Sequence, residues 1–194
     1  TYTGFLSDLG IPKSDVELVC KEGDPKEELR LLCQENNIDL LALGALVREN
    51  MFKVFTVSIA RDVCRKAKVS LLLLTHSRVE GMPCERIVVN GLDHPKTLVT
   101  IRTSLWLGSK VGSKELFVVD ELSEKSLIKP DDDKSQLKSE RKRKQIEREQ
   151  HSRIEDLLQN CQVPVNLDIK EQHVFGKRGY TIAHYAKAKR ADLL

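Results

Sequence analysis

The chain has 194 residues, of which 31% are charged and 40% hydrophobic. That balance excludes intrinsic disorder, which combines low hydrophobicity with high net charge. The net charge of +3 is too small to indicate nucleic acid or anionic lipid as a partner by itself. The longest apolar runs, at 40–47 and 69–74, are far shorter than the ~20 residues that span a bilayer. We therefore expect this piece of chain to be soluble.

The residue types that carry metal binding and catalysis form no recognisable pattern. The five cysteines are scattered without a C-x-x-C pair, which argues against a disulfide framework or a structural zinc site. The five histidines show no metal-ligand spacing, and Ser58 has no His and acid pattern near it. We therefore expect no metal site, no catalytic residues and no enzyme, and a reduced, cytoplasmic protein.

In the first part of the chain strands and helices alternate, which predicts a parallel sheet with helices on its faces. Strands are expected at 16–21, 38–43 and 69–74, with helices opening at Asp24 and spanning about 57–68. Asp24 is a good N-cap, Pro25 fits the first helical position, and Glu27 stands at N3 as in a capping box. The nearly all-apolar run at 38–43 is typical of a parallel strand buried on both faces.

The second part repeats this alternation after a linker-like segment at 76–83. Strands are expected at 87–90, 116–119, 165–170 and, beginning only, at 191–194. Helices are expected around Leu98, Ile101 and Leu105, at about 136–160 and at about 179–189, with a polar loop at 129–135. Trp106 is expected in the core.

Two short stretches recur in the same order. Residues 16–22 match residues 165–171 at four of seven positions, and Asp39-Leu40-Leu41 recurs as Asp192-Leu193-Leu194. Because both repeated stretches lie in a strand–helix–strand context, they indicate a duplicated module. The chain begins inside one copy and ends inside the next.

The ordered set of segments resembles the universal stress protein family. Val-Glu-Leu-Val-Cys-Lys-Glu-Gly-Asp-Pro-Lys-Glu-Glu-Leu at 16–29 and Ile-Asp-Leu-Leu-Ala-Leu-Gly at 38–44 resemble its third strand, capped helix and fourth strand. Residues 58–63 and 69–74 resemble its last helix and strand, and 85–93 its opening strand and acidic turn. The resemblance implies an α/β fold with an open, parallel, five-stranded, Rossmann-like sheet in two tandem copies. Residues 1–79 would be the second half of a first module. Residues 80–194 would be the first part of a second, with a charged insert and long helix at about 123–160.

Nucleotide-binding members of the family carry a G-x2-G-x9-G-[S/T] loop after the fourth strand. Here Gly44, Val47, Val57 and Ser58 occupy those positions with the spacing retained. Valine in place of two glycines stiffens the backbone and fills space that a phosphate needs. The resemblance thus implies a degenerate phosphate loop in the first copy; no cofactor is expected, and ATP or another adenine nucleotide is the alternative.

Asp93 aligns with the acidic residue that contacts the nucleotide in the family. Its other interpretation is an N-cap for the helix that begins near Pro95, since Asp is among the best N-caps. The phosphate loop of the second copy would lie beyond Leu194.

The basic run at 138–148 is the strongest local charge feature. One hypothesis makes it a surface for nucleic acid or lipid headgroups. Against it, Glu140, Glu147 and Glu149 interleave with the basic residues, and Glu140 and Lys144 form an i,i+4 pair typical of a solvated helix. We expect an exposed face and no nucleic acid partner, and we expect the first half of this helix to project or to pair with a partner helix.

We therefore expect a non-catalytic regulatory or stress-response module. Self-association between modules or a homodimer is the expected assembly, because such modules pair through edge strands in the family. The resemblance also implies, as one setting, the cytosolic tail of a cation/proton antiporter or other transporter. The alternatives are an ATP-binding protein with slow hydrolysis and an interaction module that uses the basic helix.

Overall fold

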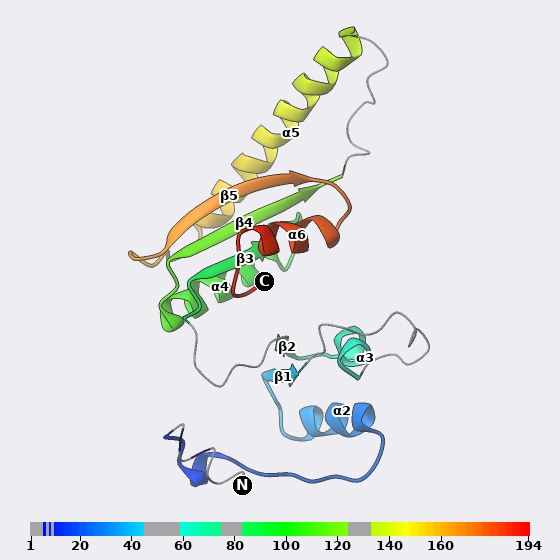
Figure 1. Cartoon of the computed structure of the whole chain (residues 1–194), viewed down its shortest axis with the longest axis vertical. Coiled ribbons are helices and arrows are strands. Elements are labelled where there is room, and N and C mark those ends of the chain that lie inside the picture. The colour runs from blue at the N-terminus through cyan, green and yellow to red at the C-terminus, as the bar shows by residue number, and fades with distance from the viewer. Residues whose placement is uncertain (1–5, 7, 9, 45–58, 75–82, 124–132) are drawn as a thin grey trace. The chain divides into compact units, whose positions relative to one another are not determined.

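The computed structural model describes residues 6, 8, 10–44, 59–74, 83–123 and 133–194, the first four residues of the last range as backbone only (Figure 1). The chain forms two compact units, Thr1–Val79 and Glu80–Leu194. Nearly all of the linker expected at 76–83 and much of the loop expected at 129–135 lie outside the described residues. Within the described ranges, no helix is both long enough and apolar enough to cross a membrane.

The first unit contains a short 3-10 turn, η1 (Lys13–Asp15), and then alternating helices and strands: α2 (Pro25–Glu35), β1 (Leu40–Gly44), α3 (Ile59–Lys66) and β2 (Ser70–Leu74). The predicted start of α2 is confirmed, because the Asp24 side chain accepts a hydrogen bond from the Lys26 N–H at 3.1 Å and Pro25 is the first helical residue. Glu27 forms an ion pair with Arg30 at 2.9 Å.

The strand predicted at 16–21 is wrong for the described structure. Val16 has extended backbone angles, but residues 16–22 belong to no strand. A strand exists only when a neighbour pairs with its backbone, and no described residue supplies that neighbour.

Strands β1 and β2 pair in parallel, with Leu40 opposite Ser70 and Gly44 opposite Leu74. The expectation that β1 is buried on both faces is wrong here, because exposed and half-buried residues alternate along it and Leu40 is 54% exposed. Helices α2 and α3 contact each other, and the half-buried Leu41 lies in the hollow between them. One face of this two-stranded sheet is therefore left uncovered by the described residues.

The second unit contains three parallel strands and three helices: β3 (Arg86–Asn90), α4 (Thr97–Val111), β4 (Glu115–Leu122), α5 (Asp133–Gln159), β5 (Asp168–Phe175) and α6 (Tyr180–Ala188). Strand β4 lies between β3 and β5. On the free side of β3, the Val88 N–H donates to the Leu193 carbonyl at 2.9 Å, and Ile87 and Leu193 form a parallel bridge. The strand expected to begin at 191–194 is confirmed as this bridge.

Helices cover both faces of this sheet (Figure 1). Ile87, Val89, Leu116 and Val118 pack against α4 and α5 on one face, and their partners include the fully buried Ile154. Val88, Phe117 and Val119 pack against α6 on the other face. Continuous burial of β3 and β4 is what parallel strands between two helical layers require.

Two expectations for this unit need correction. Strand β5 begins three residues later than predicted and runs to Phe175, because its extent is set by pairing with all of β4; Val165, the expected first residue, is fully exposed. Trp106 was expected in the core, but it lies on the outer side of α4 and is 59% exposed. The fold is α/β with parallel sheets of two and three strands, and a five-stranded sheet in two tandem copies stays a prediction.

Candidate functional site

The predicted phosphate loop lies mostly outside the described residues, which include none of Val47, Val57 and Ser58. Gly44 is described as the last residue of β1, and a Cβ atom added there would meet nothing within 4 Å. The prediction for Val47, Val57 and Ser58 therefore lies outside the described residues, and the degenerate loop stays a prediction.

Asp93 lies in the exposed turn between β3 and α4, at the carboxyl end of the sheet. The N-cap interpretation is wrong, because α4 begins at Thr97 and its N-cap is Lys96, without a side-chain cap. The turn is held instead by Thr97 Oγ1, which donates to the Leu92 carbonyl, and by the Lys96 N–H, which donates to His94 Nδ1 at 3.1 Å. Among the described residues, nothing engages the Asp93 carboxylate, so it faces solvent just after β3.

The same turn is joined to the long helix α5. Arg153 donates from Nη2 to the Gly91 carbonyl at 2.6 Å, and this nitrogen lies 3.5 Å from Asp120 Oδ1. Gly91 is buried, and a Cβ atom there would lie 3.0 Å from Val118 Cγ1 and 3.4 Å from Ile154 Cδ1. A side chain at this position would therefore require its neighbours to move by a few tenths of an ångström.

Asp120 begins a row of alternating acidic and basic groups that runs across the sheet to α5. Its Oδ2 lies 3.8 Å from His173 Nδ1, and His173 Nε2 lies 3.0 Å from Glu171 Oε1. The other Glu171 oxygen, Oε2, lies 2.5 Å from His151 Nδ1 on α5. The hydrogen bond that His151 donates to Glu171, and then the negative charge of Glu171, raise the pKa of His151 above the ordinary value of 6.5.

This row leaves polar atoms without hydrogen bonds at its centre. Asp120 Oδ2, Glu171 Oε1 and His173 Nδ1 are buried and have no hydrogen-bond partner within the described part of the chain. His173 therefore lies within ion-pair distance of both carboxylates, but neither contact has hydrogen-bond geometry. No three His, Cys, Asp or Glu side chains of the described ranges are placed to hold a metal ion.

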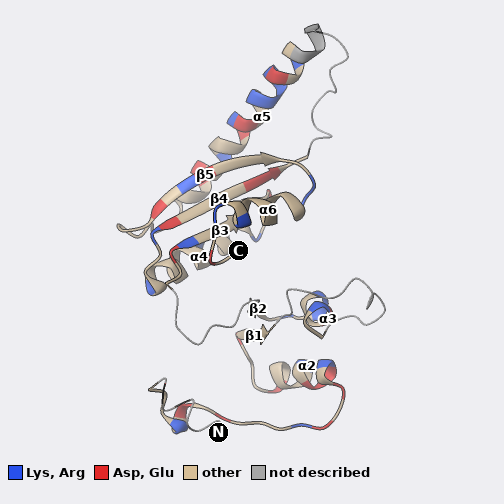
Figure 2. Ribbon diagram, viewed as in Figure 1, with Lys and Arg blue, Asp and Glu red and all other residues tan. Residues whose placement is uncertain are grey.

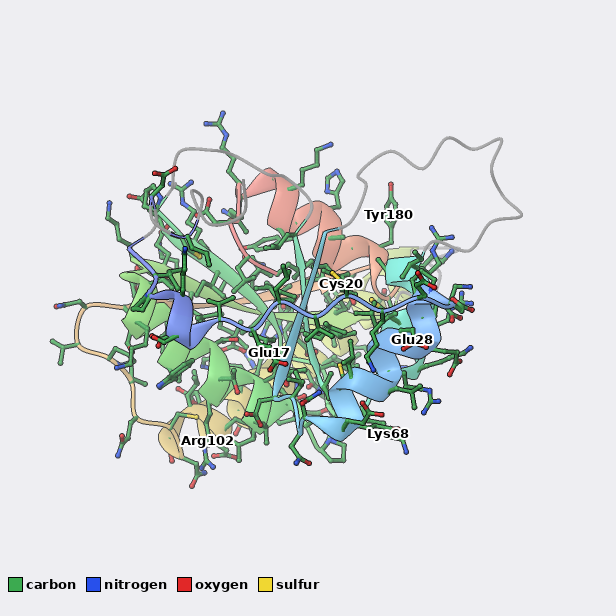
Figure 3. All side chains as sticks on the ribbon, turned by 90° about the horizontal axis from the view of Figure 1, so that it is seen from below. Glu17, Cys20, Glu28, Lys68, Arg102 and Tyr180 are labelled. Atoms are coloured by element: carbon green, nitrogen blue, oxygen red, sulfur yellow. The ribbon has the colours of Figure 1, made fainter. Side chains whose placement is uncertain are left out.

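A second buried carboxylate organises the opposite face of the sheet. Glu121 accepts hydrogen bonds from the Gly179 N–H at 2.7 Å and from the Ile182 N–H at 2.6 Å, so it caps α6 from the neighbouring strand. Only 3% of Glu121 is exposed. Because its carboxylate occupies the amide donors at this helix N-terminus, those donors are not free to bind a phosphate. Tyr180, the first residue of α6, is 70% exposed, and Figure 3 labels its side chain.

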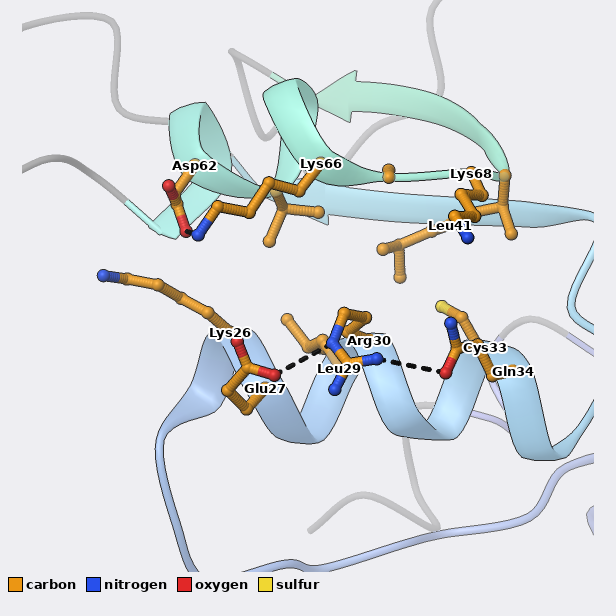
Figure 4. Close-up of a pocket in the computed structure, with 13 residues that line it drawn as sticks. Lys26, Glu27, Leu29, Arg30, Cys33, Gln34, Leu41, Asp62, Lys66 and Lys68 are labelled. Atoms are coloured by element: carbon orange, nitrogen blue, oxygen red, sulfur yellow. Dashed lines mark hydrogen bonds and ion pairs between the residues drawn. The ribbon is translucent and has the colours of Figure 1, made fainter.

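The first unit has a hollow of about 290 Å³ between α2 and α3 (Figure 4). Leu29, Leu41 and Val63 form part of its apolar floor. Part of its charged rim is paired, because Arg30 bonds to Glu27 and Gln34, and Lys66 pairs with Asp62 at 3.2 Å. Lys26 and Lys68 also line the hollow, and no described residue pairs with their side-chain amines.

Sequence reasoning missed Asp120, Glu121, Arg153, Glu171 and His173. The run Leu116–Val119 ends in Asp120 and Glu121, and two acidic residues at the end of a buried strand were the available signal. Their partners lie 33 to 61 residues away in sequence, so no local spacing joins them.

The fold and these contacts define an α/β protein with parallel sheets, in which Asp93, Asp120 and Glu121 lie at or just beyond the carboxyl ends of strands. A family model described as the universal stress protein family matches residues 7–75. The resemblance inferred from the sequence is thereby confirmed for that segment, about a third of the chain, and it indicates a stress-response module. No curated protein matches the chain.

Proposed function

We propose that the chain is a non-catalytic regulatory module of universal stress protein type, composed of parts of two tandem copies. The observation that carries this proposal is a recurring helix end. Asn37 and Arg190 are the two non-glycine residues with positive φ in the described ranges, at 50° and 52°, and they lie 153 residues apart. Asp-Leu-Leu follows each of them at the same distance.

The hydrogen bonds around the two residues match as well. The Ile38 N–H donates to Cys33 O at 3.1 Å, and the Ala191 N–H donates to Ala186 O at 2.8 Å. The residues just before Asn37 and Arg190 match too, because the Asn36 N–H donates to Leu32 O and the Lys189 N–H donates to Tyr185 O. Every partner is displaced by the same 153 residues. A left-handed residue other than glycine is uncommon, so a shared ancestor of the two helix ends explains the coincidence better than chance.

The second part of the proposal is that the first copy has lost phosphate binding. Val47 and Val57 stand where the family's loop has glycine, and close approach of backbone N–H groups to a phosphate requires small residues. Calorimetry of the full-length tandem protein with ATP, AMP and cyclic dinucleotides tests this. We expect no micromolar binding at this loop; micromolar binding that is lost in Gly44→Val or Ser58→Ala would overturn the proposal.

A second candidate function is ATP binding with slow hydrolysis at the second copy. The specific observation in its favour is that the Asp93 carboxylate has no partner among the described residues and is exposed at the carboxyl end of β3, where ligands of parallel α/β sheets bind. In the same calorimetry this function predicts binding that Asp93→Asn removes and that Gly44→Val leaves unchanged.

Self-association and a membrane setting complete the proposal. Leu40, Leu73 and Leu74 are 41–54% exposed on the two-stranded sheet, and such apolar surface is typical of an interface. Sedimentation over a concentration series should show a dimer that Leu74→Lys weakens.

We also propose that the chain belongs to the cytosolic tail of a transporter. The reading frame upstream of Thr1 tests this, because it should then encode transmembrane segments.

A further inference from the structure

The basic run at 138–148 is divided between two faces of α5. Arg143 lies on the row that faces the sheet: its guanidinium is 4.5 Å from the centre of the Phe175 ring, and its Nε lies 3.0 Å from Glu147 Oε1. Glu140 and Glu147 belong to the same row, because they precede and follow Arg143 by three and four residues. These two acidic residues therefore lie on one side of the helix, whereas Glu149 lies on the other side, where it accepts a hydrogen bond from Gln145.

The other side of this part of α5 is predominantly basic, with the exposed Glu149 as an acidic residue beside it. Lys138, Arg141, Gln145 and Arg148 follow one another at spacings of three or four residues and form one ridge, flanked by Lys142 and Lys144. All five basic residues are exposed, and none of them has an ion-pair or hydrogen-bond partner among the described residues. The i,i+4 pair expected between Glu140 and Lys144 does not form; the pair that forms is Arg143–Glu147. We call these five residues the basic face.

The basic face is accessible. In Figure 1 the first half of α5 extends past the ends of the strands, and in Figure 2 the ribbon of that projecting part carries the colours of both basic and acidic residues. Only the second half of the helix carries the buried Ile154 and the half-buried Leu157 and Leu158. From Lys138 to Arg148 the basic face is about 15 Å long, at 1.5 Å per residue.

The chemistry of the basic face narrows the class of partner. It has no apolar residue on its ridge, so it is not the seam of a coiled coil. It carries no aromatic residue on which a base would stack, as single-stranded nucleic acid requires. Gln145, the ridge residue suited to reading a base edge, is bonded to Glu149 at 2.9 Å. Glu140 and Glu147 on the opposite side would repel the phosphate walls of a groove that enclosed the helix.

A flat anionic layer meets these conditions, because it contacts only one side of a helix. We propose that the basic face of α5 binds the phosphates of an anionic phospholipid bilayer and lies on its surface without insertion. The absence of an apolar ridge means that the attraction is electrostatic, so binding weakens as salt rises. The proposal does not depend on the function proposed above, since neither the family's nucleotide positions nor the sheet edges take part.

Sedimentation of the full chain with vesicles tests this proposal. We expect binding to phosphatidylcholine vesicles that contain phosphatidylserine, no binding to phosphatidylcholine alone, and release at high salt. Each Lys or Arg at an anionic surface strengthens binding by about fivefold, so Lys138→Glu/Arg141→Glu/Arg148→Glu should lower the partition coefficient at least ~100-fold. Because Glu and Lys have similar helix propensity, circular dichroism should show unchanged helix content.

Two matched variants test whether binding depends on the charge of the basic face, on the net charge of the chain or on the shape of the arginine side chains. Lys110→Glu/Lys177→Glu/Lys187→Glu makes the same change in net charge at exposed residues outside α5, and it should bind like the wild type. Arg141→Lys/Arg148→Lys keeps the charge and should also bind. Equal binding to the two vesicle types, equal binding by the two triple variants, or tighter binding to duplex DNA or to an acidic peptide would overturn the proposal.

Discussion

Arg153 on the long helix α5 donates a hydrogen bond to the carbonyl of Gly91, which lies 62 residues earlier in the chain. The same side chain lies 3.5 Å from the carboxylate of Asp120, which is 2% exposed. One guanidinium therefore joins the turn after β3, the end of β4 and the long helix. Helix, strand and turn should consequently lose stability together when this side chain is removed.

Replacement of Arg153 by alanine should lower the free energy of unfolding of the second unit by about 2 kcal/mol, because the Gly91 carbonyl loses its donor and the buried Asp120 carboxylate loses an ion-pair partner. Urea denaturation followed by circular dichroism measures this. Arg148→Ala is the matched control, since Arg148 is exposed on the same helix without a described partner, and it should change stability by less than about 0.5 kcal/mol. Equal effects of the two substitutions would show that Arg153 is not a structural link.

Replacement of Gly91 by alanine tests the close packing of β3 beneath α5. A Cβ atom 3.0 Å from Val118 Cγ1 forces a neighbour to move, so we expect a loss of about 1–3 kcal/mol. Gly44→Ala is the control, because nothing lies within 4 Å of a Cβ there, and its effect should be neutral or slightly stabilising. A thermal unfolding midpoint for Gly91→Ala equal to that of the wild type would contradict the described packing.

The two aspartates of the repeated Asp-Leu-Leu should differ in their contribution to stability. Asp192 Oδ2 accepts hydrogen bonds at 2.9 Å from the Glu85 and Arg86 N–H groups, just where β3 begins. Asp192→Ala should therefore cost about 1 kcal/mol. Asp39→Ala should cost almost nothing in this chain, because no described residue bonds to the Asp39 side chain. Denaturant titration of both variants measures the difference. Equal unfolding midpoints for Asp192→Ala and Asp39→Ala would contradict the prediction.

The contact between His151 and Glu171 predicts a pH dependence of stability. Because the pKa of His151 is raised in the folded chain, the protonated form is the one that folding favours. Its contribution is fully present below the unfolded value of about 6.5 and disappears as the pH rises through the higher folded pKa. Denaturation midpoints of the wild type should fall over this interval relative to those of His151→Gln. Parallel pH profiles for the two proteins would rule the contact out.

The single tryptophan gives a direct test of the fold at α4. Trp106 is 59% exposed, so iodide should quench its fluorescence almost as well as it quenches the denatured protein. Protection from iodide in the folded state would mean that Trp106 is covered, either in the core or in an assembly. A dilution series distinguishes these two outcomes, because only an assembly dissociates.

Local signals in the sequence were sufficient for most helices and several strands. Asp24 and Pro25 fixed the start of α2, because a cap acts on the next few residues only. The apolar runs that became β2, β3 and β4 were also found. For β3 and β4 the reason is that burial between two helical layers demands continuous hydrophobicity. The family resemblance of residues 7–75 likewise needed only the order of such segments.

Tertiary structure alone decided the features that depend on a distant partner. The segment at 16–21 has the composition of a strand but no described neighbour, whereas β5 extends to Phe175 because β4 continues beside it. The Asp120–His173–Glu171 row and the Arg153 contact join residues from separate elements, and Asp93 proved not to be a cap because α4 begins later. Sequence determines the net charge of the basic run, but only the helix period and the position of the sheet decide which of its charges face the solvent.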